Sequence, residues 1–155
     1  MEANVLAPGR YHFEDVAVGD VIETDALTLT VDHIDRFAEL TGDFFEIHVS
    51  EDGAARHGFP ARVAHGLLVL SLVDGLKNQA RAQFAAVASL GWDWKFVAPV
   101  FPGDVLRAVL TVRGKRETRR PERGILTIDF AVLNQNGDTV QSGANMLMVL
   151  RRRSQ

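Results

Sequence analysis

FAELTGDFFEIHVSEDGAARHGFPARVAHGLLVLSLVDGL, residues 37–76, is the stretch around which this chain is organised. It places an acid, Asp43, and an imidazole, His48, in a short polar interval between two apolar segments. It then passes through His65 and Gly66 into a run of leucine, valine and serine that is typical of a buried helix. A carboxylate and a histidine near the start of such a helix can activate a water molecule against a bound acyl group.

The length and composition indicate one ordinary globular domain. The chain has 155 residues, of which 46% are hydrophobic and 24% are charged, and this is enough chain to bury a sizeable core. We therefore expect a single domain over residues 1–155. Because the chain contains no cysteine, it can form no disulfide and no catalytic thiolate, which favours a reducing compartment.

Charge and hydropathy exclude several kinds of partner. The net charge is −3, and no basic stripe with interleaved aromatic residues is present, so we expect no nucleic-acid binding. The first residues carry acids early and lack the apolar core of a signal peptide. No apolar run reaches the roughly 18 residues that a membrane span requires. We expect a cytoplasmic protein without a membrane segment.

Helical periodicity and capping residues place the helices in the first half of the chain. Asp32 and Ser50 are good N-cap residues, and Gly42 is a good C-terminal residue for a helix. These signals predict short helices over residues 33–41 and 51–57, with a loop over 43–49 between them. The long apolar segment predicts a main helix over residues 63–87, largely buried in its first half.

The second half of the chain has the alternating pattern of strands. Strands are predicted over residues 89–98, 105–117, 125–134 and 139–150, with turns at 101–104, 120–124 and 134–138. Residues 21–31 predict a further strand or strand pair, and residues 1–20 an irregular lead-in. Sequential strands joined by short turns form an antiparallel sheet. An antiparallel sheet wrapped around one long central helix is the α+β arrangement called the hotdog fold, and its exposed edge favours a homodimer.

Three segments of the chain resemble the MaoC-like dehydratases, a family that includes the (R)-specific enoyl-CoA hydratases. The first is Thr41-Gly42-Asp43 followed by Ile47-His48, which is similar to the hydratase motif of that family. The second is RVAHGLL at 62–68, and the third is FVAPVFPGD at 96–104. The resemblance covers nearly the whole chain. It implies reversible hydration of a 2-enoyl-CoA to a 3-hydroxyacyl-CoA, in the (R) form, with acyl-CoA as substrate and no cofactor.

The resemblance also implies roles for individual residues. Asp43 and His48 contact one water, with Asp43 as the expected base and His48 as its partner in proton transfer. The N–H of Gly66, at the start of the main helix, is expected to stabilise the enolate oxygen. His65 is a candidate for the same binding site, although a capping or packing role is the preferred interpretation.

Two residues depart from the family pattern. The family has Asn and Pro between the catalytic Asp and His, and this chain has Phe45 and Glu46 there. Asn offers a donor and an acceptor, whereas Phe offers neither. Both residues are candidates for substrate contact, Phe45 as a wall of an acyl pocket and Glu46 as a partner for a polar group. The alternatives that we prefer are core packing for Phe45 and a solvated position for Glu46, with His57 also solvated.

Cofactor sites are not indicated by the sequence. No pairing of His with acids has the spacing of a metal motif, so we expect no metal. Cations that could meet the phosphates of coenzyme A are Arg62, Lys77, Lys95 and Arg151–Arg153, although a solvated terminus is the simpler interpretation of the last three. Two other functions stay open: a hotdog thioesterase, and a non-catalytic subunit that binds acyl thioesters.

Overall fold

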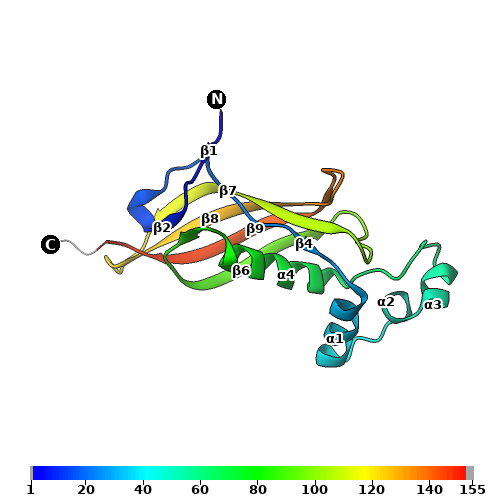
Figure 1. The fold of residues 1–155 in the computed structure, drawn as a ribbon. Helices are drawn as coiled ribbons and strands as arrows, with labels where there is room; N and C mark the ends of the chain where they lie inside the picture. The colour runs from blue at the N-terminus through cyan, green and yellow to red at the C-terminus, as the bar shows by residue number, and fades with distance from the viewer. Residues whose placement is uncertain (1, 153–155) are drawn as a thin grey trace.

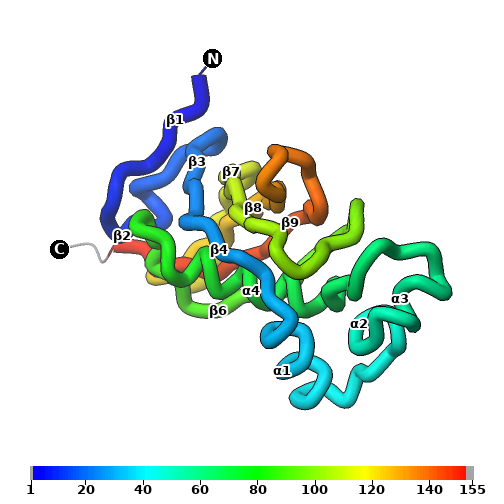
Figure 2. The backbone as a smooth tube through the Cα atoms, turned by 45° about the vertical axis from the view of Figure 1, so that its right-hand side comes forward, coloured from blue at the N-terminus to red at the C-terminus, as the bar shows by residue number. Residues whose placement is uncertain are grey.

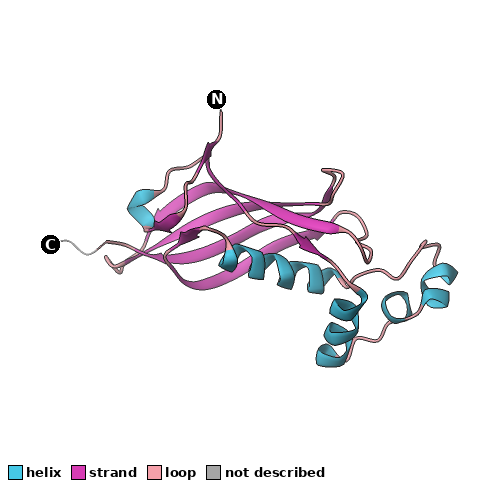
Figure 3. Cartoon of the chain, in the orientation of Figure 1, coloured by secondary structure: helices cyan, strands magenta, loops and turns pink. Residues whose placement is uncertain are grey.

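The computed structural model describes residues 2–152 as a sheet with one long helix lying along its face (Figure 1, Figure 3). The elements in chain order are β1 (Asn4–Val5), β2 (Gly9–Tyr11), the 3₁₀ helix η1 (Phe13–Asp15), β3 (Asp20–Glu23), β4 (Leu27–Thr28), α1 (Val31–Thr41), α2 (Glu46–Val49), α3 (Glu51–Arg56), α4 (Gly66–Gln79), β5 (Ala82–Phe84), β6 (Ala86–Phe96), β7 (Val105–Glu117), β8 (Arg123–Leu133) and β9 (Thr139–Leu150). No helix in this described part is both long and apolar enough to cross a membrane.

The main sheet has the strand order β1-β3-β7-β8-β9-β6, with β4 paired to β7. The long strands β6 to β9 pair antiparallel throughout, which confirms the predicted antiparallel sheet. The short strands were missed: β1 pairs with β3, and β2 pairs with β5, both in parallel. The expected irregular lead-in over residues 1–20 is therefore wrong, because these strands extend the sheets at their margins.

Helix α4 packs against the inner face of the sheet and supplies the centre of the core. Val69 and Val73 are completely buried, and they belong to one apolar cluster with Leu110, Ile128 and Leu147 of the strands. The alternation of buried residues along β7 and β8 follows from the period-two side-chain pattern of a strand. The predicted architecture, one long helix enclosed by a curved antiparallel sheet, is confirmed.

Two helix boundaries differ from the prediction. Helix α1 begins at Val31, because Thr30 rather than Asp32 is its N-cap: the Thr30 hydroxyl oxygen accepts a hydrogen bond from the His33 N–H at 3.2 Å. Helix α4 covers only Gly66–Gln79 instead of residues 63–87. The backbone becomes extended at Ala80, and the residues that follow form strands β5 and β6. Strand pairing therefore overrides the helical pattern of this segment.

The connection between β6 and β7 is a crossover rather than a hairpin. Strand β6 pairs with β9 at the far edge of the sheet, so residues 97–104 must cross the end of the sheet to reach β7. During this crossing the Val100 carbonyl accepts a hydrogen bond from the Ala64 N–H at 2.8 Å. The turn predicted at 101–104 is thus the last part of a segment that lies over the start of α4.

The three short helices gather at one end of the sheet, beyond the N-terminus of α4 (Figure 2). Gly42 ends α1 in the left-handed conformation, at φ 79° and ψ 8°, which turns the chain sharply toward Asp43. Ser50 caps α3 through its side chain, as predicted. The segment expected as a loop over 43–49 contains the short helix α2.

Burial of α4 gives a first testable prediction. Val73→Ala, at a position with no exposed surface, should lower the free energy of unfolding by about 2 kcal/mol, because two methyl groups are lost and a cavity is left. The matched change Val18→Ala, at a side chain that is 63% exposed, should change it by less than about 0.5 kcal/mol. Urea denaturation measures both values, and equal effects would contradict the assigned core.

Candidate active site

A pocket of about 510 Å³ lies at the N-terminus of α4, between α2 and the crossover segment. Its volume falls within the range of small-molecule sites, roughly 300–1,000 Å³. Most of its wall is apolar, and a few polar side chains converge on it. The lining residues are Asp43, Ile47, His48, Phe59, residues 63–67, Val69, residues 96–100 and Gln141.

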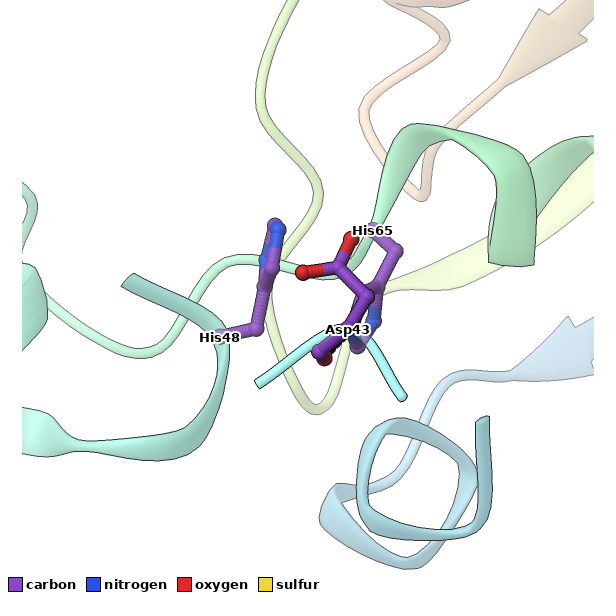
Figure 4. A group of neighbouring side chains, drawn as sticks. All are labelled: Asp43, His48 and His65. Carbon is purple, nitrogen blue, oxygen red and sulfur yellow. Dashed lines mark hydrogen bonds between the residues drawn. The ribbon is translucent and has the colours of Figure 1, made fainter. Parts of the chain in front are cut away.

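Asp43 comes directly after the turn at Gly42, and its side chain lies beside the imidazoles of His48 and His65 (Figure 4). The carboxylate oxygen Oδ1 accepts a hydrogen bond from the Phe45 N–H at 3.1 Å, which fixes the side chain to its own turn. The Thr41 hydroxyl oxygen accepts the Asp43 N–H at 3.2 Å. The acid is exposed on one side, so water can reach its second oxygen.

The tautomer of His48 follows from its one hydrogen bond. Its Nδ1 lies 2.6 Å from the Val63 carbonyl oxygen, and a carbonyl can only accept, so Nδ1 carries the proton. In the neutral ring, Nε2 is then left with a free lone pair. The His48 side chain is buried in α2, and it can therefore accept a proton at a defined atom.

Burial lowers the pKa of the His48 imidazole below its ordinary value. The nearby His65 lowers this pKa as well, whereas the hydrogen bond to Val63 and the charge of Asp43 raise it and partly oppose the effect. The net direction is downward, so the neutral imidazole with a free Nε2 is the form favoured at neutral pH.

Arg62 holds the main chain of His48 in place. Its Nε donates to the His48 carbonyl oxygen at 2.6 Å, and its guanidinium forms an ion pair with Asp35 of α1. Side chain and main chain of His48 are thus fixed separately, the ring by Val63 and the carbonyl by Arg62. The arginine that the sequence offered as a phosphate contact connects two short helices of the site.

His65 packs against His48 with ring centroids 3.9 Å apart and planes at 25°. Its Nε2 donates to the Asp43 carbonyl oxygen at 3.0 Å, and its other face meets the edge of Phe37. Its side chain makes no capping hydrogen bond to α4. Packing, rather than capping, is therefore its structural role, and it joins α1, the Asp43 turn and α4.

The cluster of Asp43, His48 and His65 has one possible metal-ligand atom from each residue, all within 4.8 Å of one another. Sequence spacing did not reveal this cluster, because His65 approaches the other two only through the fold. A histidine binds a metal through a lone pair in its ring plane, at about 2.0 Å. Two rings stacked nearly parallel do not direct such lone pairs at one point, so the observed arrangement fits a metal poorly.

The N-terminus of α4 opens onto the pocket without a side-chain cap. In the described chain, the N–H groups of Gly66, Leu67 and Leu68 have no hydrogen-bond partner outside the helix. A Cβ added to Gly66 would overlap the ring of Phe96, so only glycine permits this close approach. Unpaired N–H groups at a helix N-terminus form a site for negative charge.

Glu46 and Phe45 lie at the surface, next to α3. The Glu46 carboxylate binds the Arg56 guanidinium at 2.6 Å and His57 Nε2 at 2.8 Å, and these two hydrogen bonds lower its pKa. Glu46 and His57 both keep solvent-accessible side chains, as expected, and the structure adds that they pair with each other. Phe45 is 53% exposed, so the core packing expected for it is wrong; its ring contacts the edges of both His48 and His57.

Most cations proposed for coenzyme A phosphates have carboxylate partners in the described chain. Lys77 is buried and pairs with Asp74 at 2.8 Å, so a phosphate cannot reach it. Arg151 pairs with Glu14 and is only partly exposed, whereas Arg152 is exposed, as expected, and pairs with Asp15. Lys95 is exposed on β6, and Arg153 lies outside the described residues.

Comparison with known proteins identifies the class. The family model "MaoC like domain" matches residues 14–132, and the chain belongs to this family. A solved structure from Archaeoglobus fulgius, a monoamine oxidase regulatory protein, superposes with a TM-score of 0.86 at 29% identity and covers 96% of this chain and 100% of that one. A Mycobacterium tuberculosis protein with a double hotdog fold superposes with a TM-score of 0.82 at 20% identity, over 97% of this chain and 47% of that one. The fold is the hotdog fold, as predicted.

Curated relatives include named hydratases. The mesaconyl-CoA hydratase of Cereibacter sphaeroides is 34% identical over 147 residues, which are 93% of this chain and 42% of the relative. The (R)-specific enoyl-CoA hydratase of Aeromonas caviae is 32% identical over 107 residues, 69% of this chain and 76% of the relative. The protein MaoC of Klebsiella aerogenes is 37% identical over 76% of this chain. This chain spans 35% of MaoC and 42% of mesaconyl-CoA hydratase, less than half of either protein.

The environment of His48 predicts its titration. In an NMR pH titration, its imidazole should show a midpoint below the value of about 6.5 for an unstructured histidine, because burial disfavours the charged ring. Asp43→Asn should lower the midpoint further, since the Asp43 charge raises it. The same segment as an unfolded peptide is the reference, and a midpoint at or above the peptide value would contradict the buried neutral ring.

Proposed function

We propose that this chain reversibly hydrates a 2-enoyl-CoA to a 3-hydroxyacyl-CoA. The observation that carries the proposal is the convergence of two proton acceptors, the Asp43 carboxylate and His48 Nε2, beside the uncapped N-terminus of α4 in one pocket. Hydration of an enoyl thioester needs both components, a base for the water and a donor for the enolate oxygen. The names of the Cereibacter and Aeromonas relatives support the same class of reaction.

The geometry favours His48 as the base, where the sequence alone suggested Asp43. A water placed between the two residues can donate one hydrogen bond to the carboxylate and one to Nε2. Because Nδ1 is committed to Val63, the proton from water is accepted at Nε2, and the hydroxide adds to the β-carbon of the enoyl group. Asp43 then orients the water and stabilises the imidazolium that forms.

The electrons of the double bond move toward the thioester carbonyl as the hydroxide adds. The resulting enolate oxygen can accept hydrogen bonds from the free N–H groups at the start of α4, beginning with Gly66. The imidazolium then returns its proton to the α-carbon, which completes addition of water and restores neutral His48. No step uses a metal or a cofactor, and in line with the family resemblance the proposed product is the (R) isomer.

Substitution of the two acceptors tests the proposal. Loss of enoyl absorbance should be observed when the purified chain meets crotonyl-CoA, and Asp43→Asn and His48→Gln should each reduce kcat by about 10²- to 10⁴-fold. His57→Gln is the matched control: it removes an imidazole that binds Glu46 instead of lining the pocket, and it should retain activity within about threefold.

Two outcomes would reject the hydratase. Release of free coenzyme A thiol, with the double bond of the acyl group still intact, would indicate a thioesterase. Binding of acyl-CoA with no turnover across short, long and dicarboxylic enoyl chains would indicate a non-catalytic thioester-binding subunit.

We further propose that the chain forms a homodimer through β6. This strand lies at the edge of the sheet order, it is 11 residues long, and most of it is exposed, including Val87 and Leu90. Long exposed edge strands have unpaired N–H and C=O groups that bind another strand. A second copy is the partner that offers a strand of the same length.

Light scattering after gel filtration tests the dimer. The mass should be twice the 17.1 kDa of one chain, and Val87→Arg should shift it toward the monomer, because a cation is placed in the proposed interface. The matched change Val18→Arg, at an exposed residue in the turn before β3 and away from β6 in the strand order, should leave the mass unchanged. A monomeric parent, or equal effects of both variants, would contradict β6 pairing.

A further inference from the structure

Gln141 is a polar residue of the pocket that the proposed reaction does not use. It lies on the inner face of β9, it is only 2% exposed, and it lines the pocket beside Gly66. Its Oε1 accepts a hydrogen bond from Trp94 Nε1 at 2.8 Å, and its Nε2 donates to the Gly66 carbonyl oxygen at 3.1 Å. One side chain therefore joins β9, the edge strand β6 and the first residue of α4.

The orientation of this amide is fixed by its neighbours. The indole N–H of Trp94 can only donate, so it must face the Gln141 oxygen. The Gly66 carbonyl can only accept, so it must face the nitrogen. Both contacts require the same orientation. Reversing the amide would place its NH₂ group against the Trp94 N–H and its oxygen against the Gly66 carbonyl oxygen.

The indole of Trp94, which donates to Gln141, is itself held by its aromatic neighbours. Trp94 packs edge-on against Trp92 and Phe130, with centroid distances of 5.5 and 5.6 Å. Aromatic clusters of this geometry resist rotation of their members. The position of the indole N–H is thus set by core packing, and it sets the position of the amide.

Ala64 and His65 are anchored just before α4, but Gln141 makes the one side-chain hydrogen bond to Gly66 in the described chain. The N-cap residue His65 makes no side-chain capping bond, and Gly66 brings the conformational freedom of glycine to the first helical position. We propose that Gln141 is a positioning residue, which holds the first peptide unit of α4 so that its N–H groups are directed at the thioester carbonyl. This inference rests on the proposed hydratase function, and Gln141 acts through Gly66 instead of through the reacting atoms.

The test removes the donor and keeps the shape. Gln141→Glu preserves an acceptor for Trp94 but replaces the N–H that binds the Gly66 carbonyl with an oxygen. We expect kcat for crotonyl-CoA to fall about 10- to 100-fold with KM changed by less than about threefold, because the misaligned donors act in the transition state. Trp94→Phe should reduce kcat in the same direction, since it removes the group that orients the amide.

A matched control exists at the other end of the same helix. Gln83 donates through Nε2 to the Lys77 carbonyl at 3.0 Å and to the Ala80 carbonyl, so Gln83→Glu makes the same chemical change at the C-terminus of α4. It should leave kcat within about twofold of the parent. Equal losses in Gln83→Glu and Gln141→Glu would mean that general damage to α4, rather than positioning of the donors, explains the effect, and would overturn the proposal.

A spectroscopic measurement separates this inference from the proposed function. The infrared C=O stretch of bound crotonyl-CoA should be lowered in an Asp43→Asn background, where turnover is suppressed, and adding Gln141→Glu should return it toward the solution value. Loss of the shift supports the role of Gln141 even if the parent proves inactive with every enoyl-CoA. An unchanged shift and unchanged kcat in an active enzyme would overturn the role of Gln141 while leaving the hydratase intact.

Discussion

The burial of α4 is the constraint on which the rest of the structure depends. The helix is apolar on most sides, so the sheet must enclose it, and its buried valines are at the centre of the core. The sheet covers the helix along its length but not beyond Gly66, and the segment 97–104 crosses there from the edge strand β6 to the inner strand β7. The pocket is a consequence of this arrangement, since it forms where the helix begins and the crossover provides a wall.

The same constraint explains why the polar groups of the site converge. The first N–H groups of α4 have no side-chain cap and open onto the pocket. The short helices bring His48 and Asp43 to this point, and Val63, Arg62 and the stacked ring of His65 fix them there. Proton acceptors and the N–H donors of α4 thus line one largely apolar pocket.

The sequence predicted those features that depend on local pattern. The bounds of β7 and β9 agree with the alternation of their side chains, and the cap at Ser50 follows from its residue type. Features that depend on distant partners were missed. Helix α4 was predicted too long, because pairing of residues 82–84 with β2 is not visible in a local window. Gln141 could not be connected with Gly66, which lies 75 positions away in the sequence.

The departure of residues 45 and 46 from the family pattern has a local explanation. Glu46 is bound to Arg56 and His57 on α3, and Phe45 covers His48 from the same side. The side chain of neither residue hydrogen-bonds to His48: the His48 ring binds the Val63 carbonyl, its own carbonyl accepts from Arg62, and its N–H donates to the main-chain carbonyl of Phe45. The two side chains do not line the pocket but join this segment to α3, while Val63 sets the tautomer of the His48 imidazole.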